Sequence, residues 1–585
     1  MNAPVPSTAA PFLPRFSDPA DIDEFVDTLA RFERGEISPE VFRRYRLARG
    51  VYGQRQEGAQ MLRVKIPQGV LSSAQLRTLG DVAARWGHGY GHVTTRQNIQ
   101  YHFVPMPEVE GALRVLDTTG LTTREACGNT VRNVTADPLA GVRDHGTFDV
   151  TPYGEAITRF FLRQGWANSL PRKFKIALGY APGDTALTAI HDVGLVARVR
   201  DGQRGFTVRI AGGLSTSPQN ALLFREFLPE AELLDVCAAA VRVFDRMGNR
   251  DNKHRARLKY VLRKLGPERF RATLEEEFAA VRAHGGHPLD LSVATAPPTP
   301  PPPSPIDAES PPAPGRGYLR WRASNALAQD QAGYHAVVVR LPLGRITAAQ
   351  FDALADIAER FSEGALRLAV DQNLLLRFVP TARLGALYAA LDAAGLGAPD
   401  ARTVADVTTC PGAETCNLAV TASRQVGAAI TARLESDASL ADALVAARDA
   451  TVKVSGCPNS CGQHHIATLG WHGAARRAGD RTAPVYQLHL GGGFDDDGAR
   501  FGRQVVKVPA RRVPEAMARL LRLYAAERAE GDTPDRFFRD LAGPRVEALL
   551  HDLVALDADT PDDIFLDIGQ AQGFQVAIGE GECAA

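Results

Sequence analysis

The sequence lacks several features that would indicate a membrane or nucleic-acid function. No run of 18 or more apolar residues occurs among its 585 residues, so we expect no segment that spans a membrane. Lys plus Arg and Asp plus Glu both number 67, and this zero formal charge argues against nucleic acid as the main partner. There is also no G-x-G-x-x-G fingerprint for a flavin or nicotinamide.

The first residues, Met1 to Phe16, show neither a charged segment followed by an apolar one nor a twin-arginine signal. We therefore expect a cytoplasmic protein, in a reducing compartment where disulfides are rare. Cysteine is scarce, with seven in the chain, and Cys127, Cys237 and Cys583 are isolated thiols. The other four are grouped.

These four cysteines form a C-x5-C pair and, forty residues later, a C-x3-C pair. Cys410 and Cys416 lie in T-T-C-P-G-A-E-T-C, and Cys457 and Cys461 lie in G-C-P-N-S-C-G. Both are short loops that can present sulfur to a shared centre, and four thiolates are what a [4Fe–4S] cube requires. Structural zinc is the alternative, but zinc pairs are usually spaced C-x2-4-C, which only the second pair fits.

The chain is longer than one core usually holds, and it is internally duplicated. Pro297 to Pro314 contains ten prolines, a composition typical of a stiff, extended linker. On either side, V-K-I-P-Q-G at 64–69 corresponds to V-R-L-P-L-G at 339–344, an offset of 275 residues. F-V-P at 103–105 corresponds to F-V-P at 378–380 with the same offset.

Each copy has the pattern strand, helix, strand. Alternating apolar residues predict the first strand, and Ser72 or Thr347 marks the start of the helix. Ile99, Tyr101 and Phe103 are predicted to face one way on the second strand. Later segments, 206–214 and 486–494, each read as a strand running into glycines, which fit a plain turn or a close backbone approach to a cofactor.

The two copies differ where chemistry is expected. Arg96 corresponds to Asp371, whereas the neighbouring Gln97 and Asn98 are retained as Gln372 and Asn373. A further alignment places Asp137-Pro138 against Cys410-Pro411. We therefore expect cationic groups in the first half, cluster ligands in the second, and one active site between the halves.

The cysteine blocks, together with T-T-R-Q-N at 94–98, V-R-N-V at 131–134 and L-P-R-K-F-K at 170–175, resemble the sirohaem and [4Fe–4S] nitrite/sulfite reductase family over about residues 45–545. The resemblance implies an α+β fold of duplicated ferredoxin-like half-domains and two reductase domains with pseudo-two-fold symmetry. The implied division is an N-terminal extension (1–50), half-domain 1 (51–118), reductase domain 1 (119–290), linker (291–316), half-domain 2 (317–398), reductase domain 2 (399–550) and a C-terminal extension (551–585).

The resemblance also implies roles for particular residues. Sirohaem carries eight carboxylates and the substrate is a small anion, so buried cations must balance both. Taken singly, each such Lys or Arg also fits a solvated surface charge. The implied catalytic, anion-binding residues are Arg96, Arg132, Lys173 and Lys175. The implied sirohaem-binding residues are Arg96, Gln97, Arg132, Arg172 and Cys461. The implied cluster ligands are Cys410, Cys416, Cys457 and Cys461, with Cys461 bridging to the sirohaem iron.

The implied reaction is the six-electron reduction of sulfite to sulfide, with electrons from a ferredoxin or a separate flavoprotein. Lys175 favours sulfite, because nitrite-preferring members tend to carry Asn there and an added cation suits a dianion. Nitrite reduction, a cobalamin-pathway monooxygenase and a non-enzymatic metal-stabilised scaffold remain alternatives. A thioether between Tyr52 and Cys127 is a further hypothesis, against the default of a packed tyrosine and a free thiol.

Overall fold

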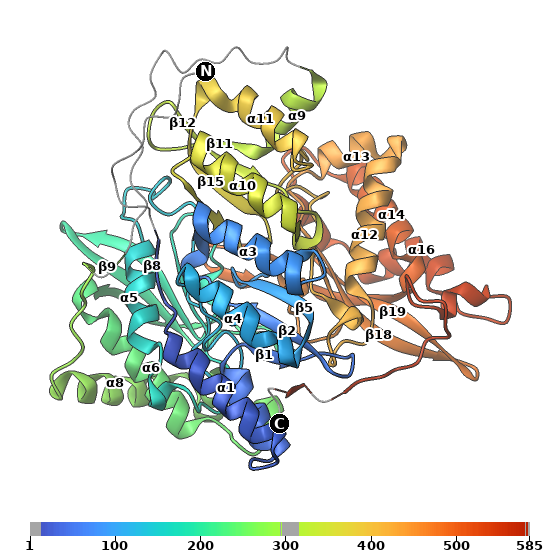
Figure 1. Cartoon of the computed structure of the whole chain (residues 1–585). Coiled ribbons are helices and arrows are strands. Elements are labelled where there is room, and N and C mark those ends of the chain that lie inside the picture. Colours follow the sequence, from blue (N-terminus) through green and yellow to red (C-terminus); the bar gives the residue numbers. More distant parts are fainter. Residues whose placement is uncertain (1–12, 293, 295–314, 580, 583–585) are drawn as a thin grey trace.

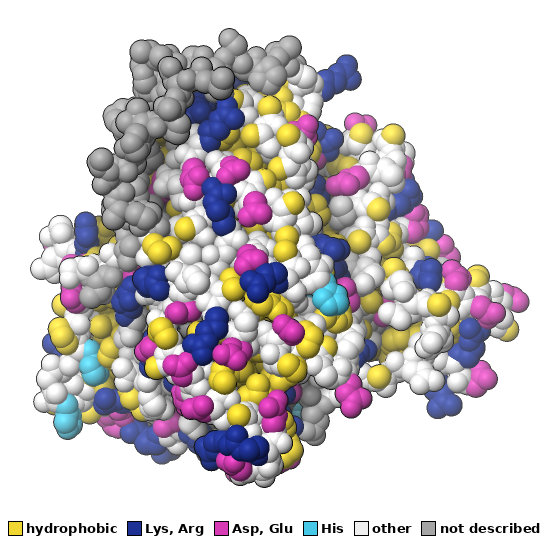
Figure 2. All heavy atoms as spheres, viewed as in Figure 1, with side chains coloured by type: hydrophobic (Ala, Val, Ile, Leu, Met, Phe, Trp, Pro, Cys, Tyr) yellow, Lys and Arg dark blue, Asp and Glu magenta, His cyan; other side chains and the backbone are white. Residues whose placement is uncertain are grey.

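The computed structural model describes residues 13–292, 294, 315–579 and 581–582, so the predicted linker at 297–314 lies outside the described residues. The described chain forms four five-stranded sheets and one two-stranded sheet (Figure 1). No described helix is long and apolar enough to cross a membrane. Basic and acidic side chains are interspersed on the face that carries α3 and α4 (Figure 2), in keeping with the zero formal charge.

Two of the sheets are ferredoxin-like, and each borrows a strand from the other half of the chain. The first has the order β1 (Val51–Gly53), β2 (Ala59–Val64), β5 (Ile99–Pro105), β4 (Tyr90–Val93), β13 (Arg345–Thr347). The second has the order β11 (Ala326–Ala328), β12 (Tyr334–Val339), β15 (Leu374–Pro380), β14 (Ala365–Leu368), β3 (Val70–Ser72). Because β13 completes the first sheet and β3 the second, neither half-domain is complete alone.

The helices of these half-domains, α3 (Ser73–Trp86) and α10 (Ala348–Phe361), pack against each other (Figure 1). Both begin as predicted, at Ser72 and Thr347, each with a reciprocal capping box to the glutamine three residues later. Gly80 lets the two helices approach closely, since a Cβ there would lie 3.1 Å from the Cβ of Phe351. One hydrophobic core therefore serves both half-domains.

The alternation predicted through Phe103 breaks at that residue. Phe103 has φ 64° and Phe378, its counterpart, has φ 54°, and a register shift accompanies each. Gln54 accepts a hydrogen bond from the amide of Phe103 at 3.1 Å, and Gln329 accepts one from Phe378 at 2.6 Å. The same bulge therefore occurs in both copies, stabilised by the same residue type.

The other two large sheets share one topology. The first has the order β6 (Thr135–Ala136), β7 (Ile176–Gly179), β8 (Val193–Arg200), β9 (Gln203–Ile210), β10 (Leu222–Pro229). The second has the order β16 (Thr408–Thr409), β17 (Val452–Ser455), β18 (Leu469–Ala478), β19 (Arg481–Leu490), β22 (Arg503–Pro509). In each, the first three strands are parallel and the last two antiparallel.

Helices cover one face of each of these sheets. The first sheet packs on α5 (Thr151–Phe161), α6 (Leu233–Met247), α7 (Leu258–Leu265) and α8 (Pro267–Ala283). The second packs on α12 (Ser423–Ser436), α13 (Ala441–Ala446), α14 (Val513–Glu527), α15 (Pro534–Asp540) and α16 (Gly543–Val554). The remaining helices are α1 (Pro19–Glu33), α2 (Pro39–Ala48), α4 (Val109–Thr118), α9 (Arg316–Asn325) and α11 (Leu384–Ala393), and the small sheet pairs β20 (Gly493–Asp495) with β21 (Gly498–Arg500).

The hydrogen-bond registers confirm the predicted alignment of Asp137 with Cys410. The amide of Asp137 donates to Leu178 at 3.0 Å, and the amide of Cys410 donates to Val454 at 3.2 Å. Leu178 and Val454 occupy equivalent places on β7 and β17, because each lies two residues after the start of its strand. The loop that begins at Cys410 in the second half therefore occupies the place that Asp137 occupies in the first half.

The C-terminal extension returns to the start of the chain. It runs as an extended segment toward α1 (Figure 1). Near its end, Glu582 pairs with Arg46 of α2 and accepts the amide of Gly53 at 2.6 Å. On the way, the amide of Gly579 donates to Asn417, next to Cys416. The extension therefore covers the first cysteine loop.

Candidate functional site

The cysteine loops follow two neighbouring parallel strands. Cys410 comes directly after β16, and Cys457 follows β17 by one residue, so both lie at the same edge of the sheet. The amide of Gly456 donates to the sulfur of Cys410 at 3.2 Å. A Cβ on Gly456 would lie 2.9 Å from the Cα of Gly412, so glycine is needed for the two loops to pack together. The structure therefore brings the two cysteine pairs to one place.

The thiols of the two cysteine loops lie close enough to influence one another's pKa. Burial raises the pKa of Cys416 to about 11 and also raises the pKa of Cys410 and Cys457, and neighbouring cysteines add to each shift. None of the six described cysteines is in a disulfide. Among the described residues, the one group of three metal-ligating atoms within 4.8 Å of one another consists of histidines. The four cysteines of the two loops are therefore available as thiolate ligands, as the predicted cluster requires.

Arg96 lies in the turn between β4 and β5, beside the start of β7. Its guanidinium donates to the hydroxyl of Thr135 at 3.0 Å, contacts Nε2 of His191 and donates to the carbonyl of Asn133. Its Nε is buried without a partner. Desolvation lowers the pKa of Arg96 to about 9, so the group is still a cation at neutral pH. Arg96 is thus a half-buried cation with a spare, desolvated donor, which suits an anionic ligand.

Lys175 lies just before β7, in a group of cations. Its amide donates to Asp192 Oδ2 at 2.9 Å, and the guanidinium of Arg257 donates to the same oxygen at 2.8 Å. Burial lowers the pKa of Lys175 well below its usual value, and the charges of Arg257, Lys173 and Arg96 lower it further, whereas Cys461 raises it. Lys175 is therefore held within the electrostatic reach of both the cations and the cluster loop.

The other predicted basic residues are Arg132, Arg172 and Lys173. Arg132 is buried, with its guanidinium donating to the carbonyls of Gly128 and Ala126, both at 2.9 Å. Arg172 and Lys173 are half-buried, but they precede β7 rather than lying within a regular strand, as Phe174 makes only an isolated bridge to Val131.

Gln97 is fully buried, and its amide is hydrogen-bonded to backbone groups of Ala136 and Leu368. This observation assigns Gln97 a structural task. Its binding of sirohaem stays a prediction.

The two halves meet at the second cysteine loop. The hydroxyl of Thr95 donates to the carbonyl of Cys461 at 3.0 Å, one residue from Arg96. Ser215 donates to the side chain of Asn459, which lies between Cys457 and Cys461, at 3.1 Å. The expectation of a site between the halves is thus supported by direct contacts. Cys461 is exposed, which leaves its sulfur accessible to a second group.

The sequence interpretation missed four residues: His191, Asp192, Arg257 and Lys259. Lys259 is buried, donates to the carbonyls of Leu214 and Ser217, and has a pKa that desolvation lowers to about 7. The spacing R-x-K at 257–259 repeats the basic spacing of 173–175 and was a usable signal. The sequence around His191 and Asp192 carried no such signal.

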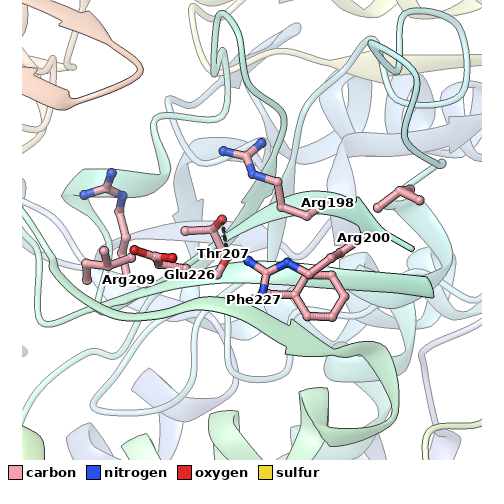
Figure 3. A pocket seen from close by; sticks show the side chains of 8 residues that line it. Arg198, Arg200, Thr207, Arg209, Glu226 and Phe227 are labelled. Carbon is pink, nitrogen blue, oxygen red and sulfur yellow. Dashed lines mark hydrogen bonds between the residues drawn. The ribbon is translucent and has the colours of Figure 1, made fainter. Parts of the chain in front are cut away.

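A separate pocket of about 330 Å³ lies on the open face of the sheet formed by β8, β9 and β10 (Figure 3). Arg198, Arg200, Arg209 and Glu226 line it, and the hydroxyl of Thr207 donates to the carbonyl of Glu226 at 2.9 Å. None of the predicted site residues lines this pocket. It is therefore distinct from the cation and cysteine site.

Comparisons with known proteins agree with this geometry. The family described as "Nitrite and sulphite reductase 4Fe-4S domain" matches residues 127–281 and 400–539. The family described as "Nitrite/Sulfite reductase ferredoxin-like half domain" matches residues 52–118 and 327–394. The fold class implied by the resemblance, with its duplicated half-domains and two reductase domains, is confirmed. The exact domain bounds given above stay a prediction.

Individual relatives are divided in their named substrate. A protein named Sulfite reductase (ferredoxin), from Mycobacterium tuberculosis, is 31% identical over 480 residues, which are 81% of this chain and 80% of the relative. The Assimilatory ferredoxin-dependent nitrite reductase of Haloferax mediterranei is 29% identical over 532 residues, 88% and 87% of the two chains. The solved structure titled "Structure of Mycobacterium tuberculosis NirA protein" superposes with a TM-score of 0.74 at 28% identity, covering 90% of this chain and 97% of that one.

The family matches, the paired cysteine loops and the converging cations lead to one assignment. Members of the family carry sirohaem and a [4Fe–4S] cluster, and the donors found here, four thiols and several buried cations, are those that the two groups need. The chain belongs to the nitrite and sulfite reductase family of oxidoreductases.

Proposed function

We propose that this protein reduces sulfite to sulfide: SO₃²⁻ + 6 e⁻ + 6 H⁺ → S²⁻ + 3 H₂O. The observation that carries the proposal is Lys175, which lies with Arg96, Lys173 and Arg257 in one cationic group. A dianion gains more from each such charge than a monoanion does, particularly where burial reduces screening. Sulfite is therefore the substrate that this site favours over nitrite.

The residues that hold the two prosthetic groups follow from the loops and the resemblance. Cys410, Cys416 and Cys457 would hold the cluster alone, and the exposed Cys461 would hold it jointly with the sirohaem iron. Arg96, Arg132 and Arg172 would balance carboxylates of the macrocycle. When bound, the two groups supply the electrons one at a time.

The chain itself orients the anion and supplies protons. Lys173, Lys175 and Arg96 donate hydrogen bonds to sulfite oxygens, and so stabilise negative charge as each sulfur–oxygen bond breaks. The lowered pKa of Lys175 makes its ammonium a stronger acid than an ordinary lysine, which suits it to give a proton to a leaving oxygen. Lys259, whose pKa burial lowers to about 7, adds to the positive charge beside Arg257 while it donates to the carbonyls of Leu214 and Ser217.

The electron donor that we propose is a ferredoxin. Relatives from Synechococcus elongatus and Mycobacterium tuberculosis are named for ferredoxin, and they cover about four fifths of this chain. A separate flavoprotein is the alternative donor. We propose the cytoplasm as the location, because four thiolate ligands require a reducing compartment.

Steady-state kinetics of the Lys175→Asn variant with a reduced dye test the substrate assignment. For sulfite we expect kcat/KM to fall by about 10² to 10³, the usual effect of losing one oxyanion donor. For nitrite the fall should be smaller, so that the sulfite-to-nitrite ratio decreases. Lys264→Asn, at an exposed lysine on α7, is the control and should change neither value. Equal losses for both anions, with sirohaem content unchanged, would contradict the sulfite assignment.

Nitrite reduction to ammonia is the second candidate. The observation in its favour is that relatives from Haloferax mediterranei and Synechococcus elongatus are named nitrite reductases at 29% identity. A wild-type kcat/KM for nitrite above that for sulfite would select it. The family match speaks against the scaffold alternative. The relatives described above are named reductases, which favours reduction over the monooxygenase alternative.

A further inference from the structure

A cluster of histidines is buried beside the second cysteine loop. His464 lies in the short helix η12 (His464–Ile466), three residues after Cys461. His472 lies on β18, and His489 lies on the neighbouring strand β19. His489 pairs with Gly470, two residues from His472, so both side chains point from the same face of the sheet. None of the three has a part in the reaction proposed above.

The three rings are close enough to share one ion. Their ligand nitrogens all lie within 4.8 Å of one another. The ring of His464 is centred 4.8 Å from each of the other two rings. Nδ1 of His472 and Nε2 of His489 share a hydrogen bond of 2.7 Å, which a bound ion would replace. Gly470 makes this approach possible, because a Cβ at that position would overlap the carbonyl oxygen of His464.

The two ring nitrogens of His464 form no hydrogen bond with a described residue. Its side chain is 0% exposed, yet neither Nδ1 nor Nε2 has a hydrogen-bond partner. A buried polar group without a partner costs stability, and an ordered water or an ion is the usual explanation for such a group in a native structure. His489, by contrast, has its Nδ1 3.3 Å from the carbonyl of Gly502. That contact leaves Nε2 of His489 as the ligand atom and is the usual second partner of a metal-bound histidine.

We propose that His464, His472 and His489 form a binding site for a divalent late first-row transition-metal ion, with Zn²⁺ as the reference ligand. Three imidazole nitrogens with a fourth position left for water or another ligand form a well-known zinc donor set. Burial keeps the rings neutral, as a metal ligand must be, since it lowers the pKa of His472 to about 4 and of His489 to about 3.

The duplicated half of the molecule shows that the fold alone does not need these histidines. Gly194 on β8 corresponds to Gly470, and a Cβ there would overlap the carbonyl of Thr188 in the same way. By the paired registers, His464, His472 and His489 correspond to Thr188, Val196 and Arg209. The site is therefore an addition specific to the second half. A bound ion would join η12, and with it the segment after Cys461, to β18 and β19.

Zinc binding to the full-chain holoenzyme tests the proposal. Protein with its cluster intact, as judged by iron content, is given Zn²⁺ alone, desalted and analysed for zinc. We expect about one zinc per chain, held by nitrogen scatterers at roughly 2.0–2.1 Å in X-ray absorption at the zinc edge. Scattering by sulfur at roughly 2.3 Å, or no retained zinc, would overturn the proposal. This measurement needs no variant and does not depend on activity or on the substrate.

Substitutions identify the ligands. In His464→Gln and in His489→Gln, zinc affinity should fall by more than the roughly 10- to 100-fold that loss of an outer partner costs. The matched control is His102→Gln, because His102 is also buried with both ring nitrogens unpartnered but is not one of the three grouped histidines. It should retain zinc. Unchanged affinity in the two ligand variants would overturn the proposal.

Discussion

The two halves of this molecule share a fold but differ in the side chains placed at equivalent points. The first half has Asp137 where the second has Cys410, the predicted cluster ligand, and the first has Arg96 where the second has Asp371. The loop before each central strand shows the same contrast. Asp192 accepts the amide of Lys175 at 2.9 Å, whereas the hydroxyl of Thr468 accepts the amide of Thr451 at 2.9 Å.

This comparison separates scaffold from function. Backbone contacts are repeated, as in the capping boxes of α3 and α10 and the bulges at Phe103 and Phe378, because both copies must close the same sheets. The charged side chains and the cysteines of the site are not repeated between the two copies. Duplication thus left a pseudo-symmetric frame in which each half carries only a part of one site.

The largest effect is expected at the pair Cys410 and Asp137. Cys410→Ser should lose cluster iron and lower activity by at least about 10³, since the cube needs four thiolates. Asp137→Asn, at the equivalent point of the first half, should keep the iron. Iron analysis and reduced-dye turnover measure both. Equal iron content in the two variants would break the comparison.

The next effect concerns the pair Arg96 and Asp371. Arg96→Gln should lower kcat/KM for sulfite by about 10² to 10³, or about 3–4 kcal/mol, because the proposed donor to the anion is lost. Asp371→Asn should lower it by less than about tenfold. Steady-state kinetics of preparations matched for sirohaem content measure both losses. A larger loss in the aspartate variant would contradict the assignment of cations to the first half.

A smaller effect, on the pH dependence of stability, is expected at His465, which corresponds to Ala189 in the first half. Burial lowers the pKa of His465 to about 4, so between pH 6.5 and about 4 the unfolded chain binds a proton that the folded chain does not. Stability is therefore lost as the pH falls through this window, by about 2 kcal/mol at pH 5 for this residue.

Urea unfolding at pH 7 and pH 5, with a chelator present, should show that His465→Gln reduces this pH dependence. The control, His551→Gln at an exposed position on α16, should leave it unchanged. A His465→Gln protein with the full wild-type pH dependence would show that this ring is not held neutral by burial.

The smallest effect compares the two helix caps. Ser72→Ala and Thr347→Ala should each lower the free energy of unfolding by about 1 kcal/mol, because each removes one half of a capping box. Ser72 is buried and Thr347 is exposed, so we expect the serine variant to lose somewhat more. Thermal unfolding of the two proteins side by side measures the difference. A loss in only one of them would mean that the caps are not equivalent.

Much of this arrangement could be predicted from the sequence, because it rests on local signals. Alternation, capping residues and the repeat at 275 residues gave the half-domains, and cysteine spacing gave the cluster loops. The exchange of β3 and β13 between sheets left no local signal, since it depends on packing between segments far apart in the chain. The role of Asp192 was hidden for the same reason: its partners, Lys175 and Arg257, are 17 and 65 residues away.

Sulfite binding, followed through the visible absorption of the tetrapyrrole, most directly tests whether cations of the first half and sulfur of the second half serve one centre. We predict that sulfite shifts the spectrum of the wild-type protein, and that Arg96→Gln weakens this binding at least tenfold while keeping its iron. Cys461→Ser should lose the tetrapyrrole together with the cluster. Unaltered sulfite affinity in Arg96→Gln, or a full tetrapyrrole complement in Cys461→Ser, would contradict the account.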